Sequence, residues 1–444
     1  IESPCQRAEE AQSLTGPLLL LGTPGSNSAL TALAQKHGLS LALPEDDPTQ
    51  EGYCLRAAQD DGRPVRVILG ASPRALIWAT MDLLDALRAG QPLAEQLFDR
   101  VEKPHFQMRA SQCNILFGNS DEMAAKVVAC CEDIDYAASL RLNTIVLGMD
   151  WPAGCSQLVS YRYFPELVDT VDAELVDQQA TAFNQAIRHA GEWGQNVYLT
   201  LTELYYPTEL AQRHPEILAS APPRGADRWY RPPGSGFTSL ARPDKLCPSH
   251  PTTRSFFKAK IHELAERFPT IAGVQIWVSH GTCDIFYCDC PTCHALQPHE
   301  RLSRLYQDAL DAMDEAGLTG GRVILRTYLG GWRQALAERF FLPLAGQLPK
   351  RVIVGTKAQY GDMYYGNAIH PLAGAFHGND EIIEFCLGGE YRAGLRWGTV
   401  APVADDMARR ARIHARLGCT GLWMRHAEWR NRFNEVDFRV FGAL

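Results

Sequence analysis

Two acidic residues follow apolar, strand-like segments in the C-terminal half of the chain. Asp362 lies in KAQYGDMYYG and Glu390 lies in IIEFCLGGEYRAG, 28 residues later (390 − 362). If these segments are neighbouring strands of a parallel barrel, both carboxylates belong to the same rim. Two carboxylates held several ångströms apart can divide the acid, base or nucleophile roles that glycosidic bond cleavage requires. The alternative is that both are ordinary loop carboxylates.

The neighbours of these two acids favour a sugar site. Tyr364 follows Asp362 closely, and Tyr391 follows Glu390 directly, after Gly388 and Gly389. Aromatic rings stack on the C–H faces of pyranoses, and glycines let the backbone approach a ligand closely. In the loops, Trp151 and Trp332 are candidates for a saccharide cleft, whereas Trp277 and Trp423 lie within strand-like runs and are expected in the core.

Two cations interrupt otherwise apolar strand-like runs, namely Arg326 in RVILRTYL and Lys357 in RVIVGTKAQ. An unpaired buried charge costs several kcal/mol, so each must have a partner. One interpretation pairs them with Glu384 or another barrel carboxylate, and the other has them bind a carboxylate of the substrate. Three further polar residues end strand-like segments and are second-rank candidates for substrate binding: Asp150, Glu203 and Arg425.

A cysteine-rich segment reads Cys283, Cys288, Cys290 and Cys293, with the spacing C-x4-C-x-C-x2-C. Four thiolates can hold a structural zinc ion and leave no open position for catalysis. The alternatives are local disulfides, with Cys247 as a further partner, or free thiols. The role is structural in either form, so no cofactor is expected to be required for catalysis.

Length, charge and hydropathy narrow the class of protein. The chain has 444 residues, 46% of them hydrophobic, and a formal net charge of −8. No basic tract is present, which argues against nucleic acid as a partner, and no apolar run reaches the 18 or more residues of a membrane span. The sequence begins at Ile1 without Met, which fits either a removed leader or an expressed fragment. A secreted or periplasmic location is slightly favoured over a cytoplasmic one, and the oligomeric state stays open.

The order of the expected elements divides the chain. Residues 1–103 read as a small non-catalytic α/β domain, with strands in LLLLG, EGYCLRAAQ and PVRVILG and two amphipathic helices. A linker at 102–106 then leads into the second domain, residues 104–444. There, eight strand-like runs are expected at 111–118, 144–150, 196–204, 273–279, 322–329, 351–359, 381–388 and 420–426. With helices expected at 121–140, 172–191, 252–267 and 300–316, this alternation predicts a (β/α)8 TIM barrel.

A stretch of some forty residues after the third barrel strand is rich in proline and glycine, and no regular structure is expected there. Loops of that length inside a compact domain are usually functional. An open doubly wound sheet is the alternative architecture, but no G-x-G-x-x-G follows the first strand.

The sixth and seventh barrel strands resemble those of the α-glucuronidase family of glycoside hydrolases. In that family a Lys and an Asp follow one strand and a Glu-Tyr pair follows the next. This pattern is matched here by Lys357 and Asp362, and then by Glu390 and Tyr391. Arg326 matches an arginine of the family's fifth strand. The N-terminal domain is similar to the one that precedes the barrel in those enzymes and in hexosaminidases. The resemblance implies inverting hydrolysis and binding of a uronic acid by the cations.

One departure from the family lies after the fourth strand. The family carries its general acid glutamate there, with a lysine four residues earlier, whereas QIWVSHGTCD has His280 and Ile276 at those places. The proton donor is then His280, Asp284 or a carboxylate of another loop such as Glu203.

The sequence therefore predicts a glycoside hydrolase of an acidic oligosaccharide or polysaccharide, in which Asp362 and Glu390 supply base function. A catalytically silent carbohydrate-binding barrel is the main alternative. A metal-dependent hydrolase ranks lower, because no H-x-H or H-E-x-x-H pattern accompanies a strand end.

Overall fold

The computed structural model describes residues 16–90, 98–114, 123–148, 154–202, 205–220, 246–277, 288, 290–327, 337–358, 368–386, 404–425 and 435–443. The chain divides into two compact units, of which the first ends at Gln107 and the second begins at Met108. No helix within these described ranges combines the length and the apolar character needed to cross a membrane.

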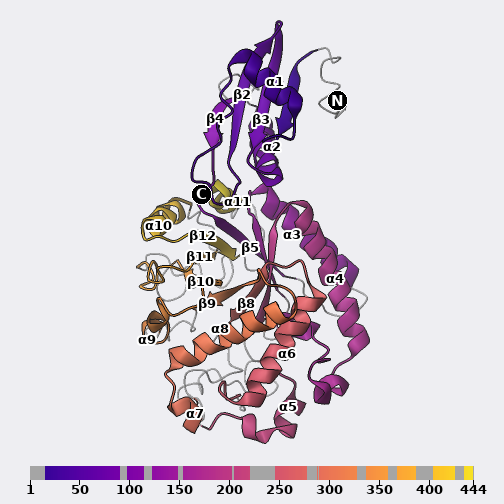
Figure 1. The fold of residues 1–444 in the computed structure, drawn as a ribbon, viewed down its shortest axis with the longest axis vertical. Helices are drawn as coiled ribbons and strands as arrows, with labels where there is room; N and C mark the ends of the chain where they lie inside the picture. Colours follow the sequence, from indigo (N-terminus) through magenta and orange to yellow (C-terminus); the bar gives the residue numbers. More distant parts are fainter. Residues whose placement is uncertain are drawn as a thin grey trace. The chain divides into compact units, whose positions relative to one another are not determined.

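The first unit is a four-stranded sheet in the order β1-β3-β2-β4, with two helices (Figure 1). β1 and β3 are parallel, whereas β2 is antiparallel to both of its neighbours, β3 and β4. The elements are β1 (Leu18–Gly22), α1 (Ser28–His37), β2 (Tyr53–Asp60), β3 (Arg63–Gly70), α2 (Pro73–Arg88) and β4 (Asp99–Glu102).

Each face of this sheet packs against one of the two helices. Along β3, Val67 faces the cluster that contains Leu30 of α1, while the next residue, Ile68, faces the cluster that contains Trp78 of α2. Successive strand side chains point to opposite faces, so an apolar strand can serve two cores at once. The strand β4 was not expected from the sequence, because DRVE is short, polar and mostly exposed.

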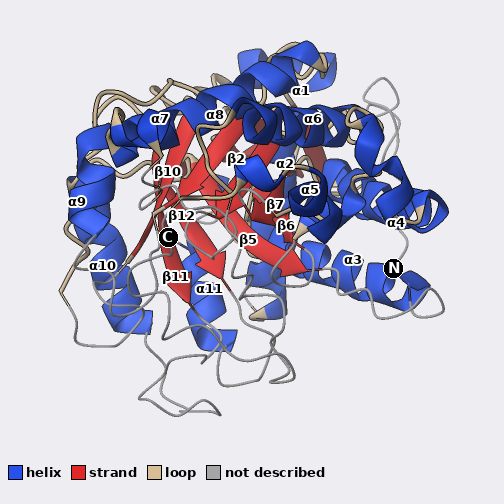
Figure 2. Cartoon of the chain, turned by 90° about the horizontal axis from the view of Figure 1, so that it is seen from below, coloured by secondary structure: helices blue, strands red, loops and turns tan. Residues whose placement is uncertain are grey.

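The second unit is a closed barrel of eight parallel strands, surrounded by helices in the view of Figure 2. Each strand pairs with its neighbours in chain order, and β12 pairs with β5 to close the barrel. The strands are β5 (Met108–Asn114), β6 (Thr144–Gly148), β7 (Asn196–Thr202), β8 (Gly273–Trp277), β9 (Arg322–Arg326), β10 (Val352–Lys357), β11 (Glu381–Cys386) and β12 (Gly421–Arg425).

All eight predicted strands are present, and the fold class predicted from the sequence is confirmed. The helices of this unit are α3 (Met123–Ser139), α4 (Ala173–Glu192), α5 (Thr208–Arg213), α6 (Pro251–Arg267), α7 (Pro291–His294), α8 (Pro298–Glu315), α9 (Ala337–Phe341), α10 (Ala404–Arg416) and α11 (Glu435–Ala443). Short 3-10 helices occur at η4 (Cys155–Leu158), η5 (Pro165–Thr170), η6 (Pro215–Ile217) and η9 (Leu342–Leu344).

The expectation of a structureless stretch after the third barrel strand was wrong at its start. There α5 and η6 form, and Leu210 of α5 and Ile217 of η6 are fully buried. Two apolar residues that reach the core are enough to fix these short turns, although proline and glycine dominate the residues that follow. Residues 221–245 lie outside the described part of the chain.

The barrel interior changes from apolar to polar toward the carboxyl ends of its strands. A buried apolar cluster contains Ala110, Tyr198, Ile324 and Ile382, one from each of β5, β7, β9 and β11. Two positions further along the same four strands stand buried polar residues: Gln112, Thr200, Arg326 and Glu384. Since side chains two apart on a strand point the same way, this polar layer lies above the apolar one, at the end where barrel active sites form.

One glycine is required for closure. Gly273 begins β8 with φ at +149°, and a Cβ atom there would lie 1.8 Å from the carbonyl oxygen of Arg322 on β9. No side chain fits at that distance, so the two strands can approach only because residue 273 is glycine.

Candidate active site

A buried ion cluster occupies the carboxyl end of β9 to β12. The guanidinium of Arg326 donates two hydrogen bonds to the Glu384 carboxylate, with Nε and NH2 each 2.7 Å from an oxygen. Lys357 Nζ lies 3.5 Å and Arg425 NH1 lies 4.0 Å from Glu384 Oε1. Three strands thus carry a cation to one carboxylate on the fourth.

The protonation state of Glu384 follows from its surroundings. Burial, which is complete for this side chain, would raise its pKa; the charges of Arg326, Lys357 and Arg425 outweigh burial and hold the pKa of Glu384 well below its usual range. The carboxylate is therefore ionised in the folded protein at neutral pH. Of the two partners proposed for Arg326 from the sequence, the structure places Glu384 against it in bidentate geometry, the stronger arrangement for this pair.

Two tryptophans lie close to the same guanidinium. The Arg326 carbon Cζ lies 4.7 Å from a ring centre of Trp277 on β8 and 5.6 Å from one of Trp423 on β12. Both indoles are buried, which confirms the core position expected for them. The rings attract the cation and so stabilise it in its buried position.

The strands that precede the two candidate carboxylates are adjacent and parallel. β10 pairs with β11 so that Lys357 lies opposite Glu384. In the sequence, Asp362 follows the end of β10 by five positions (362 − 357), and Glu390 follows the end of β11 by four (390 − 386). Eleven of the residues predicted for the site lie outside the described part of the chain: Asp150, Trp151, Glu203, His280, Cys283, Asp284, Trp332, Asp362, Tyr364, Glu390 and Tyr391.

The connection after β6 is attached to α6 by one buried carboxylate. Glu263 accepts hydrogen bonds from Ser160 N at 2.8 Å and Oγ at 2.7 Å, and from Arg162 N at 3.2 Å. Arg267, one helical turn later, pairs with the same carboxylate at 2.9 Å. A segment that leaves the rim of the barrel is thereby fixed to the helix layer.

Two buried histidines near β10 and β11 were not predicted from the sequence. His370 Nδ1 accepts a hydrogen bond from Leu372 N at 3.2 Å, and His414 Nε2 lies 3.3 Å from the carbonyl oxygen of Ala358. Burial lowers the pKa of each to about 4; the charges of His414 and Lys357 contribute for His370, and that of Arg410 contributes for His414. The one feature of the sequence that could have indicated them was His414, a histidine on the apolar face of α10.

These histidines predict acid destabilisation in a defined range. In the unfolded chain both bind a proton near pH 6.5, whereas in the folded protein they resist protonation until about pH 4. The contribution of the two neutral histidines to the free energy of unfolding is therefore fully present above pH 6.5. It is lost as the pH drops to 4, by roughly 3 kcal/mol per histidine. Urea unfolding at pH 7.0 and pH 5.0 measures the loss. In His370→Asn, whose amide can still accept from Leu372 N, we expect a smaller loss; an unchanged one would contradict the assignment.

Three of the four predicted metal-binding cysteines come together, and the fourth thiol of their group is Cys247. The sulfur atoms of Cys247, Cys288, Cys290 and Cys293 all lie within 4.8 Å of one another. The sequence placed Cys247 only among the disulfide partners, because it stands 41 positions before Cys288 (288 − 247). Proximity of this kind comes from the fold rather than from local spacing.

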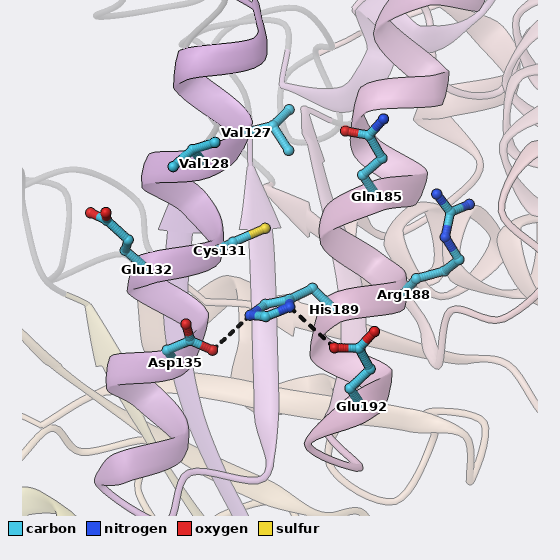
Figure 3. A pocket seen from close by; sticks show the side chains of 9 residues that line it. All are labelled: Val127, Val128, Cys131, Glu132, Asp135, Gln185, Arg188, His189 and Glu192. Atoms are coloured by element: carbon cyan, nitrogen blue, oxygen red, sulfur yellow. Dashed lines mark hydrogen bonds and ion pairs between the residues drawn. The ribbon is translucent and has the colours of Figure 1, made fainter.

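A shallow groove on the outer helix layer is separate from these groups. It lies between α3 and α4 and is lined by residues such as Val128, Cys131, Asp135 and His189 (Figure 3). His189 lies between Asp135, at 2.6 Å, and Glu192, at 3.4 Å. No strand of the barrel contributes to its lining, so it is not a candidate for the sugar site.

Comparison with known proteins identifies the fold. No family model matches this sequence, and no curated protein matches it. Among solved structures, a GH138 enzyme targeting pectin rhamnogalacturonan II matches with a TM-score of 0.60 at 12% identity, over 96% of this chain and 63% of its own. A β-N-acetylhexosaminidase from Bacteroides fragilis has a TM-score of 0.54 at 14% identity, over 96% of this chain and 87% of its own.

A GH20 exo-β-N-acetylglucosaminidase from Vibrio harveyi matches in the same way, with a TM-score of 0.53 at 13% identity, over 96% of this chain and 70% of its own. These structural neighbours are glycoside hydrolases. At such identities the likeness shows the fold: a (β/α)8 barrel with an N-terminal α/β domain. The chain spans less than two thirds of the length of the GH138 enzyme.

Proposed function

We propose that this chain is a glycoside hydrolase that cleaves acidic, uronic-acid-bearing saccharides by inversion. The observation that carries the proposal is the adjacency of β10 and β11. These strands bring Lys357 and Glu384 to the cationic cluster at the carboxyl end of the barrel, and in the sequence they lead into Asp362 and Glu390. Active sites of (β/α)8 enzymes form at that end.

The chemistry assigned to these residues follows the inverting scheme. One of Asp362 and Glu390 takes a proton from the water that attacks the anomeric carbon, while a separate acid protonates the departing oxygen. His280 and Asp284, which follow β8 in the sequence, are the donors proposed for that second step. No metal or organic cofactor enters either step.

The stereochemistry of the first product tests the reaction. Proton NMR during hydrolysis of aryl uronides and uronic-acid oligosaccharides should show first a sugar whose anomeric configuration is opposite to that of the substrate. A product of retained configuration would overturn inversion. Binding of the same oligosaccharides by calorimetry, with no product released from any of them, would instead identify the silent carbohydrate-binding barrel.

Recognition of an anionic group is assigned chiefly to Arg425. Its side chain retains 19% exposure, compared with 2% for Arg326 and for Lys357, so it is the cation of the cluster most open to a ligand. A charge-assisted hydrogen bond to a carboxylate contributes about 1.5–3 kcal/mol, which corresponds to roughly 10- to 100-fold in affinity.

We therefore expect Arg425→Gln to raise the KM for uronides by roughly 10- to 100-fold and to change kcat much less. Steady-state kinetics on a uronide and on the matching neutral glycoside measures the effect. Arg409→Gln, at an exposed position of α10, is the matched control and should change neither constant. An unchanged KM in Arg425→Gln would remove this residue from substrate binding.

A further inference from the structure

Four cysteine thiols from two distant segments meet beside the barrel. Cys247 belongs to the segment that precedes α6, whereas Cys288, Cys290 and Cys293 follow β8 and lead into α7. Three of the four are buried and Cys290 is half-buried. They form a cluster of their own, against which the side chain of Ala219 packs.

The distances between the sulfur atoms are those of ligands that share one ion. Cys247 Sγ lies 3.6 Å from the Sγ atoms of Cys290 and of Cys293. Four thiolates at about 2.3 Å from a tetrahedral zinc ion stand about 3.8 Å apart. A disulfide requires about 2.05 Å, and all four thiols are free in the structure.

Two hydrogen bonds involve the sulfur atoms, and a cation binds the backbone of the same segment. The backbone N–H of Cys293 donates to Cys290 Sγ at 3.3 Å, and Ser249 Oγ lies 3.1 Å from Cys293 Sγ. The buried guanidinium of Arg301 donates to the carbonyl oxygens of Cys288, at 3.1 Å, and of Cys293. Such neighbours orient metal ligands and offset the charge of a tetrathiolate centre, which is −2 with zinc bound.

We propose that Cys247, Cys288, Cys290 and Cys293 bind one structural zinc ion. Four thiolates complete its coordination and leave no position for water or substrate. These four thiolates leave no place for Cys283, which the spacing had suggested and which lies outside the described residues. The ion ties the segment before α6 to the segment after β8, both of which adjoin the carboxyl end of the barrel, and so anchors the connection on which His280 and Asp284 stand in the sequence.

Metal content of the full-length chain tests the proposal. Chain purified under reducing conditions and dialysed against zinc and then metal-free buffer should contain about one zinc per chain by plasma mass spectrometry. We expect Cys247→Ser and Cys293→Ser to lose it, whereas Cys283→Ser, the matched control, should retain it. Retention in Cys247→Ser together with loss in Cys283→Ser would overturn the ligand set.

A second measurement uses the unaltered chain, because the serine variants can fail to fold. Cobalt in place of zinc should give the intense visible absorption of a tetrahedral thiolate site. Chelation of the zinc should lower the melting temperature, since binding of the metal is linked to folding. Absence of stoichiometric metal from the folded chain, or mass spectrometry that finds disulfides among these four cysteines in it, would refute the proposal.

Discussion

Glu384→Gln is expected to destabilise the barrel by about 3–5 kcal/mol, because it leaves Arg326 buried without its counter-charge. The amide retains one acceptor oxygen but presents N–H groups to the other N–H of the guanidinium. Lys357 and Arg425 then repel Arg326 without the Glu384 carboxylate that all three now share. The measurement is the free energy of urea unfolding at pH 7, followed by tryptophan fluorescence.

Glu381→Gln is the matched control on the same strand. Glu381 is also buried, but its carboxylate accepts hydrogen bonds from two backbone N–H groups, those of Gly374 at 2.8 Å and Phe376 at 2.7 Å. Its replacement removes one hydrogen bond and should cost about 1–2 kcal/mol. Equal losses in the two variants would mean that charge pairing with Arg326 does not stabilise the barrel.

Asp362→Asn and Glu390→Gln are expected to reduce kcat on uronides by roughly 10²- to 10⁴-fold each, the range of a lost general acid or base. Each substitution keeps the size of the side chain and removes its ability to take a proton. Comparing an activated aryl uronide with an unactivated disaccharide distinguishes the base role assigned to this pair from the acid role assigned to His280 or Asp284. Loss of the base slows both substrates alike, whereas loss of the acid slows mainly the substrate with the poorer leaving group.

Two exposed carboxylates serve as controls for these substitutions. Glu338→Gln on α9 and Asp61→Asn in the first unit should leave kcat unchanged. Circular dichroism and the melting temperature establish that each variant is folded. A variant of Asp362 or Glu390 that keeps activity within about twofold of the parent excludes that residue from proton transfer.

The architecture could be predicted from the sequence because the barrel strands are buried on both faces. Runs such as RVILR and VIVGTK carry successive apolar residues with only a few polar ones, and each stands out against the polar helices that flank it. The short elements could not be predicted in this way. β4 is polar, and α5 depends on Leu210 reaching a core that local sequence does not contain.

Residues of the candidate site could be predicted only where a charged residue interrupts an apolar strand. Arg326 and Lys357 were recognisable as cations in apolar strands, and so was the need for a partner such as Glu384. That the Arg326 guanidinium also lies close to both Trp277 and Trp423 depends on barrel closure, which brings β8 and β12 to the same side chain. The place of Cys247 beside three other thiols and the two buried histidines were not predicted for the same reason: their neighbours come from distant segments.

The change from apolar to polar side chains inside the barrel affects the register in which its strands pair. Sliding β11 by two positions keeps the same set of side chains pointing inward, so hydrophobic patterning alone does not forbid it. That slip would exchange Ile382 with Glu384, which would separate the carboxylate from Arg326 and leave it among aliphatic groups. A barrel that closed with β11 in this shifted register would contain a buried carboxylate without its counter-charge, which is unfavourable. The buried pair of Arg326 and Glu384 therefore favours a single register of the barrel strands.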